Sequence, residues 1–184
     1  MISECVLNGE NVRLRPVGEG DLSLFVRWLN DPDVRYWLWL SDEPELTMES
    51  EREWFEEMRG DPTSVVWCIE TAEGQPIGNL ALNRVNETKG RAIMGIFIGE
   101  KDCWSQGYGT DAIRRVLRYA FQELGLRRVG LDTYEDNLRA IRCYEKCGFV
   151  REGLLRAHSL RLGQPVNAVV MSVLREEFEV QPWR

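Results

Sequence analysis

The chain has 184 residues, of which 43% are hydrophobic, and carries 23 basic against 30 acidic side chains, for a net charge of −7. This length suits a single domain over residues 1–184 with a full hydrophobic core. The acidic balance argues against a general nucleic-acid binder, and no apolar run approaches the ~20 residues that a membrane helix needs.

Cysteine and histidine usage limits the chemistry further. Five cysteines, none in a Cys-x-x-Cys pair, and a single histidine (His158) argue against a disulfide framework and against a Cys/His metal site. The first ten residues lack the basic start and apolar core of a signal peptide. We therefore expect a cytoplasmic protein without a metal ion and without a membrane partner.

Charge is unevenly distributed along the chain. Residues 31–61 hold eleven acidic and three basic side chains, whereas residues 104–156 hold ten basic and seven acidic ones. The second segment suits an anionic ligand and the first a cationic one. Solvated helix faces explain the same pattern, so both interpretations stay open.

The first third of the chain predicts a strand and two helices. Residues 11–15 alternate in polarity and predict a strand that ends at Pro16. An amphipathic helix is expected to begin near residues 19–21 and to end before Asn30-Asp-Pro-Asp33. The aromatic residues 34–40 fit a short helix or a loop. A second helix is expected from about 47–50 to Met58, with Ser50-x-x-Glu53 as a capping box.

The remainder alternates between strands and helices. Three strands joined by hairpin-length turns predict an antiparallel meander, at 65–70, 76–85 and 91–98. The later elements are a helix at 110–124 with Gly125 as its C-cap, a strand at 128–133, a helix from Asn137 to 146 or 147, and a hairpin of 149–159 with 165–174. The pattern predicts one mixed α/β domain.

A glycine loop lies between the strand at 91–98 and the helix that follows. Its sequence is Trp104-Ser105-Gln106-Gly107-Tyr108-Gly109-Thr110-Asp111-Ala112. Glycines allow backbone N–H groups to approach a ligand closely, and a helix N-terminus adds partial positive charge. The loop is therefore predicted to bind the pyrophosphate of a nucleotide-like cofactor.

The same loop fits a dinucleotide-binding fingerprint, because Gly107-x-Gly109-x-x-Ala112 is followed by Asp132 after 25 residues. In that fold, however, the first glycine follows its strand directly and begins a parallel sheet. Here eight residues, 99–106, separate strand from glycine, and hairpin strands come before them. The dinucleotide interpretation is therefore the weaker one.

Three segments together indicate a different cofactor. The run from Ile93 to Ala112 resembles the acetyl-CoA loop of the GNAT superfamily of N-acetyltransferases, with Trp104 where Gln or Arg is usual. The segment Asn137-x-x-Ala140-x-x-x-Tyr144-x-x-x-Gly148-Phe149 resembles the helix that follows in that family. Val12-Arg-Leu-Arg-Pro and Trp28-Leu-Asn-Asp-Pro-Asp-Val resemble the branch of ribosomal-protein N-terminal, polyamine and aminoglycoside acetyltransferases.

The resemblance implies a fold and a cofactor site. The expected fold is a mixed, mostly antiparallel sheet of about six to seven strands flanked by about four helices. Amides from Ser105 to Thr110 are expected to bind the CoA pyrophosphate, with Trp104 and Asn137 as further contacts. Phe97, Ile98 and Gly99 are expected to pair with pantetheine, whose two amides match an opened strand edge. A hairpin strand with tolerant glycines at 95 and 99 is the alternative, and Asn137 fits a mere helix cap equally well.

Catalytic roles also follow from the resemblance. Tyr144 is expected to be the general acid for the CoA sulfur, and Asp132 a general base that acts directly or through water. A free backbone N–H near Ile98 or Gly99 is the candidate for stabilising the thioester oxyanion. Tyr144 as a packed core aromatic and Asp132 as a turn residue are the structural alternatives. Cys143, Cys147 and His158 are interpreted as structural.

The acceptor is expected to be a small-molecule amine or a peptide N-terminus. Aromatic residues and carboxylates between Trp28 and Met58, with Trp37 and Trp39 as candidate substrate contacts, favour a cationic amine. The implied enzyme moves acetyl from acetyl-CoA to a primary amine by direct attack in a ternary complex. A non-catalytic CoA-binding sensor is the alternative from another functional class, and a homodimer is left open.

Overall fold

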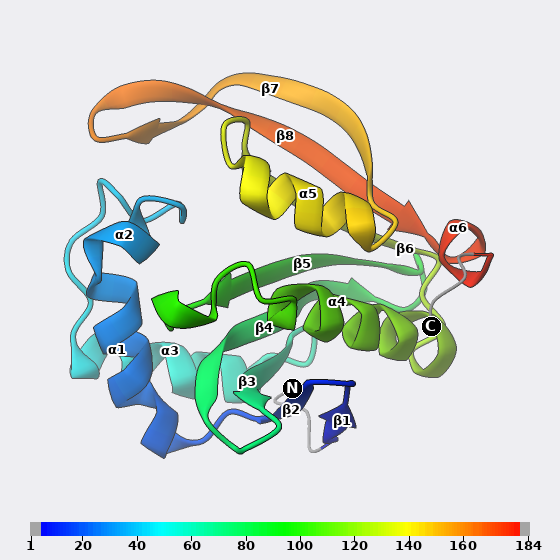
Figure 1. The fold of residues 1–184 in the computed structure, drawn as a ribbon, viewed down its shortest axis with the longest axis horizontal. Coiled ribbons are helices and arrows are strands. Elements are labelled where there is room, and N and C mark those ends of the chain that lie inside the picture. Colours follow the sequence, from blue (N-terminus) through cyan, green and yellow to red (C-terminus); the bar gives the residue numbers. More distant parts are fainter. Residues whose placement is uncertain (1–4, 181–184) are drawn as a thin grey trace.

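The structure is a computed structural model that describes residues 5–180. One mixed sheet runs through the molecule with the strand order β1-β2-β3-β4-β5-β6-β8-β7 (Figure 1). The strands are β1 Leu7–Asn8, β2 Val12–Pro16, β3 Val65–Thr71, β4 Pro76–Asn86, β5 Arg91–Ile98, β6 Arg128–Tyr134, β7 Val150–Arg161 and β8 Gln164–Leu174. The α-helices are α1 Leu22–Asn30, α2 Pro32–Arg35, α3 Met48–Gly60, α4 Tyr108–Arg118, α5 Leu138–Lys146 and α6 Arg175–Glu179.

The predicted mixed and mostly antiparallel sheet is confirmed, since β5 and β6 form the one parallel pair in the described sheet. The described residues hold eight strands and six α-helices, more than the six to seven and about four expected. The additional elements include β1, α2 and α6, of two, four and five residues. Elements of about one turn or less carry no measurable hydrophobic period, so sequence patterning misses them. Within residues 5–180, no helix is long and apolar enough to cross a bilayer.

Two helix boundaries differ from the sequence prediction. The capping box of α3 is built by Thr47 and Ser50, because the Ser50 amide donates to Thr47 Oγ1 (3.1 Å) and the Thr47 amide to Ser50 Oγ (2.9 Å). The expected Ser50-x-x-Glu53 box is therefore wrong by one turn. Helix α4 begins at Tyr108, two residues before the predicted start, and a π-helical turn, Tyr119–Glu123, follows it. Gly125 ends this segment at φ +66°.

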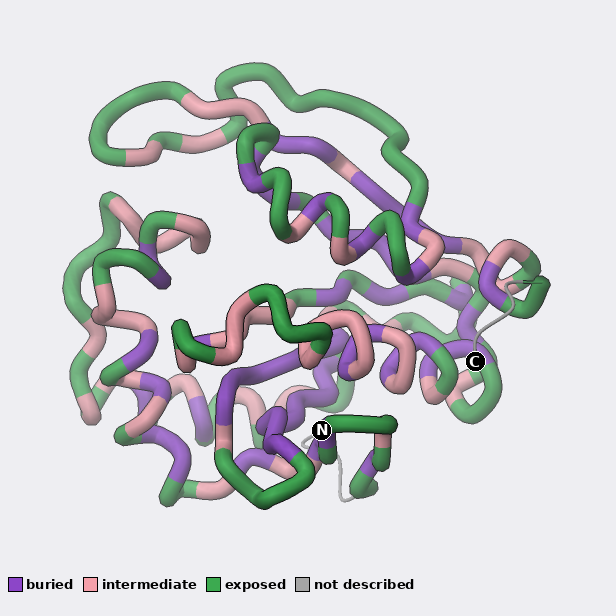
Figure 2. Tube along the Cα trace, in the orientation of Figure 1, coloured by how far each residue is buried: buried purple, intermediate pink, exposed green. Residues whose placement is uncertain are grey.

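Both faces of the sheet carry a hydrophobic core, and the central strand β3 is buried throughout (Figure 2). Trp67 and Ile69 belong to the cluster that includes residues of α4 and α5, whereas Val66 and Cys68 join the cluster formed with α1 and α3. This two-sided burial explains why residues 65–70 are a nearly continuous apolar run instead of an alternating one.

The parallel pair β5–β6 diverges after a short contact. Their register covers three pairs, from Arg91 with Arg128 to Ile93 with Gly130. Beyond Ile93, β5 stays paired with β4 as far as Ile98, and β6 stays paired with β8 as far as Tyr134. The two halves of the sheet therefore separate towards the C-terminal end of β5. Helix α4 lies beside the half that contains β4 and β5, and α5 beside the half that contains β8 and β7 (Figure 1).

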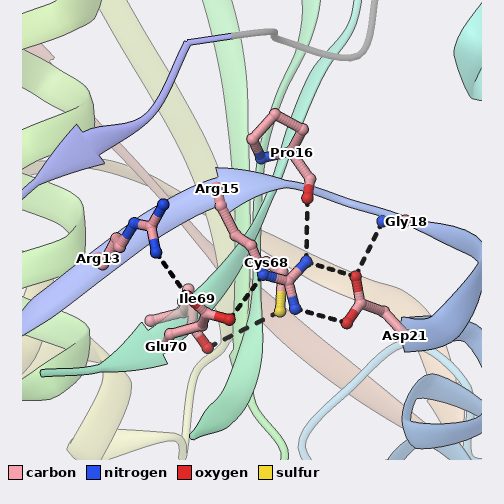
Figure 3. A network of polar contacts seen from close by, with 8 residues as sticks. All are labelled: Arg13, Arg15, Pro16, Gly18, Asp21, Cys68, Ile69 and Glu70. Carbon is pink, nitrogen blue, oxygen red and sulfur yellow. Dashed lines mark hydrogen bonds and ion pairs between the residues drawn. The ribbon is translucent and has the colours of Figure 1, made fainter. Parts of the chain in front are cut away.

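A charged network ties β2, β3 and the start of α1 together (Figure 3). The Arg15 guanidinium donates to both carboxylate oxygens of Asp21 (2.6 and 2.7 Å) and to Glu70 (2.6 Å). The Asp21 and Glu70 side chains are only 7% and 9% exposed. Asp21 also accepts from the Gly18 amide (2.8 Å). Burial, reinforced by the Asp21 charge, raises the pKa of the neighbouring Cys68 thiol to about 12, so this cysteine is inert at neutral pH.

Candidate active site

A cavity of about 930 Å³ occupies the region where β5 and β6 diverge. We call one part of it the glycine-loop half, which is lined by the segment before α4, the first turn of α4 and residues of α5. The other part, the α1–α3 half, is lined by side chains of α1 and α3 and by the face of β4 and β5 that these helices cover. One continuous cavity therefore reaches both sides of the sheet.

The glycine-loop half presents unpaired backbone amides. Gly107 is the N-cap of α4 at φ +93°, has no side chain to cap the helix, and accepts from the Asp111 amide (3.0 Å). The N–H groups of the three helical residues before Asp111 therefore have no carbonyl one turn earlier. Ser105 also has a positive φ of +63°. Backbone turns of this kind at a helix N-terminus concentrate N–H groups on an anion.

Basic side chains line the same half. Arg139, Arg142 and Lys146, all on α5, reach the cavity wall. The Arg139 guanidinium lies 3.8 Å from the centre of the Trp104 ring, and burial lowers the pKa of Arg139. Trp104 in turn donates its indole N–H to the Ile98 carbonyl (2.7 Å), which fixes the ring against the end of β5.

The end of β5 leaves one edge open. The Gly99 amide donates to the Ile77 carbonyl (2.8 Å) on the β4 side. Because peptide groups alternate along a strand, those of Ile96 and Ile98 point the other way, where β6 has already diverged. The sequence offered the amides of Ile98 and Gly99 as donors to the oxyanion. The Gly99 amide already donates to Ile77, so the Ile98 amide is the remaining candidate.

Gly95 and Gly99, near the end of β5, have different surroundings. The register from Gly78–Ile98 to Asn83–Ile93 is continuous, so Gly95 makes no bulge. Gly99 is buried under Trp28, where an added Cβ would lie 2.2 Å from the indole ring. The separation of the sheet halves comes from the end of the β5–β6 pairing.

Tyr144 and Asp132 both line the cavity. Tyr144, on α5, is 8% exposed and packs against Phe149, with 5.9 Å between ring centres. Burial is the main cause that raises the pKa of its hydroxyl, and the negative charges of Cys143 and Asp132 add to it. Asp132, on β6, is exposed. The fold thus places the two side chains that the sequence had singled out near each other.

Asn137 lies in the cavity wall and also caps α5, because its side-chain oxygen accepts from the Ala140 amide (3.2 Å). The capping prediction is confirmed. Its nitrogen donates to Thr133 at 3.5 Å. Both polar atoms of Asn137 therefore have protein partners, and a contact with a cofactor stays a prediction.

The cysteine pair of α5 packs against α4. The Cys143 sulfur lies 3.2 Å from the Thr110 hydroxyl, and the Cys147 thiol donates to the Thr110 carbonyl (3.5 Å). The neighbouring Cys147 thiol lowers the pKa of Cys143, and the Thr110 hydroxyl adds to this effect. Cys147 is fully buried, whereas Cys143 reaches the cavity wall.

The aromatic segment after α2 reaches the hairpin of β7 and β8. Trp37 and Trp39 line the cavity, but the Arg161 guanidinium already lies 4.4 Å from the Tyr36 ring centre and 5.8 Å from that of Trp37. The His158 ring lies against Trp39 at 5.7 Å. The faces that a cationic substrate was expected to use are therefore partly taken by a cation of the protein itself.

Most of the predicted site residues reach the cavity wall. Those that do are Trp37, Trp39, Phe97, Ile98, Trp104, Ser105, Gly107, Gly109, Thr110, Asp132, Asn137 and Tyr144. Gly99, Gln106 and Tyr108 are not among the lining residues. Within residues 5–180, no three His, Cys, Asp or Glu side chains converge as metal ligands would.

Sequence reasoning did not single out several polar lining residues, four of which matter for the site. Glu51 and Asn79 lie in the α1–α3 half, and Arg139 and Arg142 in the glycine-loop half. The two arginines follow Asn137 on the same amphipathic helix, so their position in the sequence could have indicated that they lie near the cofactor site. Glu51 is one of many acidic residues between 31 and 61, and no sequence feature distinguishes it.

Comparisons with known proteins agree with this geometry. The profile of the acetyltransferase (GNAT) domain family matches residues 11–150. The N-acetyltransferase YoaA of Bacillus subtilis, itself uncharacterised, is 27% identical over 172 residues, 92% of this chain and 97% of its own length. Aminoglycoside N(6')-acetyltransferase type 1 of Klebsiella pneumoniae is 30% identical over 156 residues, 79% of this chain and 77% of its own length.

Among solved structures, spermidine N-acetyltransferase from Vibrio cholerae in complex with CoA and spermine superposes with a TM-score of 0.84 at 25% identity. The match covers 92% of this chain and 98% of that one. Profile, relatives and structure lead to the same assignment as the glycine loop and the divergent sheet. The chain therefore belongs to the GNAT acetyltransferase family, as an enzyme with acetyl-CoA as its co-substrate.

Proposed function

We propose that this enzyme transfers an acetyl group from acetyl-CoA to a cationic primary amine by direct attack within a ternary complex. The observation that carries the proposal is the single cavity that joins the unpaired amides at the start of α4, the open edge of β5, and the pair Tyr144 and Asp132. A ternary complex requires both substrates in one space, and the cavity reaches both faces of the sheet.

The residues of the glycine-loop half fit CoA. Acetyl-CoA supplies an activated acetyl thioester on a long arm that carries a pyrophosphate and two amides. Amides of the segment 105–110 and the side chains of Arg139, Arg142 and Lys146 match the pyrophosphate in charge and donor type. The outward peptide groups of Ile96 match a pantetheine amide as an added strand would, whereas the Ile98 carbonyl already accepts from Trp104.

Three groups of the chain have proposed chemical roles. The Ile98 amide donates to the developing oxyanion. The Tyr144 hydroxyl, whose raised pKa keeps it protonated at neutral pH, donates to the departing sulfur. Asp132 accepts a proton from the acceptor, directly or through water, because an alkyl ammonium with a pKa of ~10.4 must be neutralised before it can attack.

Relatives support the choice of a cationic acceptor. Proteins similar to this chain are named aminoglycoside N(6')-acetyltransferase and spermidine N(1)-acetyltransferase. Both names describe acceptors with several amino groups. A peptide N-terminus stays among the acceptors to be tested.

The direct test is thiol release from acetyl-CoA in the presence of polyamines, aminoglycosides, amino acids and short peptides. We expect release above the acceptor-free rate with at least one cationic amine. Binding of acetyl-CoA by calorimetry without release for any acceptor would support a non-catalytic CoA-binding module instead. Binding of NAD(H) in place of acetyl-CoA would refute the cofactor assignment.

The glycine loop can be tested separately through Gly109. A Cβ at this position would meet only the Cys143 sulfur, at 3.8 Å, so the protein itself tolerates alanine. Gly109→Ala is nevertheless expected to weaken CoA binding about ten-fold, because the methyl group stands where phosphate must approach the backbone. Calorimetric titration with CoA measures this change.

Gly20→Ala is the matched control, since an added Cβ there meets nothing within 4 Å. It should leave CoA affinity unchanged. Gly107→Val should weaken binding more than Gly109→Ala, because φ at Gly107 is +93° and a side chain is strained there as well. Full retention of affinity in both loop variants would contradict the phosphate-binding role.

A further inference from the structure

Glu51 is a buried carboxylate without a partner. It lies in α3, is 5% exposed, and its side chain makes no hydrogen bond or ion pair with any residue among 5–180. Burial alone raises its pKa. Burying a carboxylate without a compensating partner costs free energy of folding, so we expect such a side chain to serve a function.

The Glu51 side chain borders the cavity. It is one of the lining residues of the α1–α3 half. Three described side-chain atoms are fully enclosed without a hydrogen-bond partner, and the Glu51 oxygens are not among them. Since no protein group within the described chain satisfies these oxygens, they are available to a molecule in the cavity.

Asn79 adds a second polar group to the same half. It lies in β4, in register with Cys68 and Phe97, and is 8% exposed. Its side-chain nitrogen is enclosed and has no acceptor among the described residues. The group of Asn79 that can accept a hydrogen bond from an ammonium group is its carbonyl oxygen.

The charges along the cavity are separated. The basic lining residues Arg139, Arg142 and Lys146 all belong to α5, in the glycine-loop half, while the acidic lining residues are Glu51 and Asp132. No basic side chain lines the α1–α3 half among the described residues. The described residues of this half supply no counter-ion for Glu51, so a cationic ligand can fill that place.

Apart from Ser50 and Asn83, the rest of this half is largely apolar and aromatic. Phe25, Leu29, Trp54 and Met58 line it, and the Phe25 and Trp54 rings meet edge to face with 6.0 Å between centres. Such walls suit methylene groups, and an aromatic ring near a carboxylate favours a cation over a neutral polar group.

We propose that Glu51 is the counter-ion for a second, non-reacting ammonium group of the acceptor, so that the preferred acceptors carry at least two amino groups. Asn79 is the auxiliary polar contact of this subsite. The inference rests on the proposed acetyl transfer to an amine, and it deepens that proposal by naming the charge pattern of the acceptor.

The test compares terminal diamines with n-alkylamines of equal chain length. In the wild-type enzyme, kcat/KM should favour the diamine by about ten-fold or more, the size expected for a hydrogen-bonded buried charge pair. In Glu51→Gln this ratio should fall to near one, through a higher KM for the diamine and with little change in kcat. The exposed Glu53 of the same helix provides the matched control, and Glu53→Gln should keep the wild-type ratio.

A Glu51→Gln variant that keeps the diamine preference would overturn the subsite. An equal fall of kcat for both amines at constant KM would also overturn it, because Glu51 would then act in the chemical step. Thermal unfolding checks that the isosteric variant is folded, and its melting temperature should be no lower than that of the wild type.

Calorimetry of the diamine binding to the protein–CoA complex gives a readout independent of turnover. Glu51→Gln should weaken this binding, and unchanged affinity would again overturn the subsite. If wild-type enzyme acetylates no amine, the proposed function fails while this binding measurement still decides on Glu51.

Discussion

Replacing Tyr144 with phenylalanine is expected to lower kcat about 100-fold or more, the usual range for removal of a positioned general acid. The hydroxyl is buried in the cavity wall, and its raised pKa keeps the proton in place throughout the neutral range. Without it, the departing thiolate loses the proton donor proposed for it. Steady-state thiol release with saturating acetyl-CoA and a responsive amine measures the change.

Two comparisons separate chemistry from folding and binding in this variant. CoA affinity should stay within a few-fold of wild type, because the ring and its packing on Phe149 are kept. Tyr119→Phe is the matched control, since Tyr119 packs on the core against Trp67 and is not among the lining residues. Unchanged turnover in Tyr144→Phe would remove the residue from the proton-donor role.

Replacing Arg15 with alanine is expected to lower the free energy of unfolding by about 3 kcal/mol or more. The substitution leaves the carboxylates of Asp21 and Glu70 buried without their shared cation (Figure 3). An uncompensated buried charge is destabilising because desolvation is no longer offset by an ion pair. Urea unfolding followed by tryptophan fluorescence or circular dichroism measures the loss.

Arg13→Ala is the control, because Arg13 approaches the same Glu70 but is 53% exposed, at an N–O distance of 3.9 Å. An exposed pair of this kind contributes about 0–1 kcal/mol. If the two variants lose the same stability, the network does not depend on the buried geometry of Arg15.

Much of the fold could be predicted because the patterns were long. The meander of β3, β4 and β5 and the final hairpin are signalled by turn residues at hairpin spacing, and α4 by apolar residues at helical spacing. Family resemblance supplied what these patterns lack, namely which ligand the glycine loop serves. The profile match and the acetyltransferase relatives confirm the family, whereas the role of the loop residues stays a prediction.

The site was predictable to the extent that its residues lie next to the glycine loop or to the Asn137 motif. Gly99 shows the limit of that reasoning. A glycine at a strand end suggests an open edge, but its amide is committed to Ile77 and its Cα lies under Trp28. Contacts between residues more than twenty positions apart carry no local sequence signal.

The surroundings of Arg161 and Glu51 also could not be predicted from the sequence. Each is one of many charged residues, and polarity patterns treat all of them as solvated surface. In the folded chain, Arg161 lies against aromatic rings of the segment after α2, while Glu51 is buried at the cavity wall without a counter-ion. The role of each residue depends on the side chains that the fold places beside it.

By itself, the sequence determined the alternation of strands and helices, the glycine loop at the start of a helix, and membership of an acetyl-CoA-dependent family. These follow from local periodicity, backbone freedom at glycine, and short motifs. The tertiary structure decided where β5 and β6 part, which amide of that edge is free, and which acidic side chain faces the cavity. Such features depend on long-range register and desolvation, because the same residue is solvated or buried according to what folds against it.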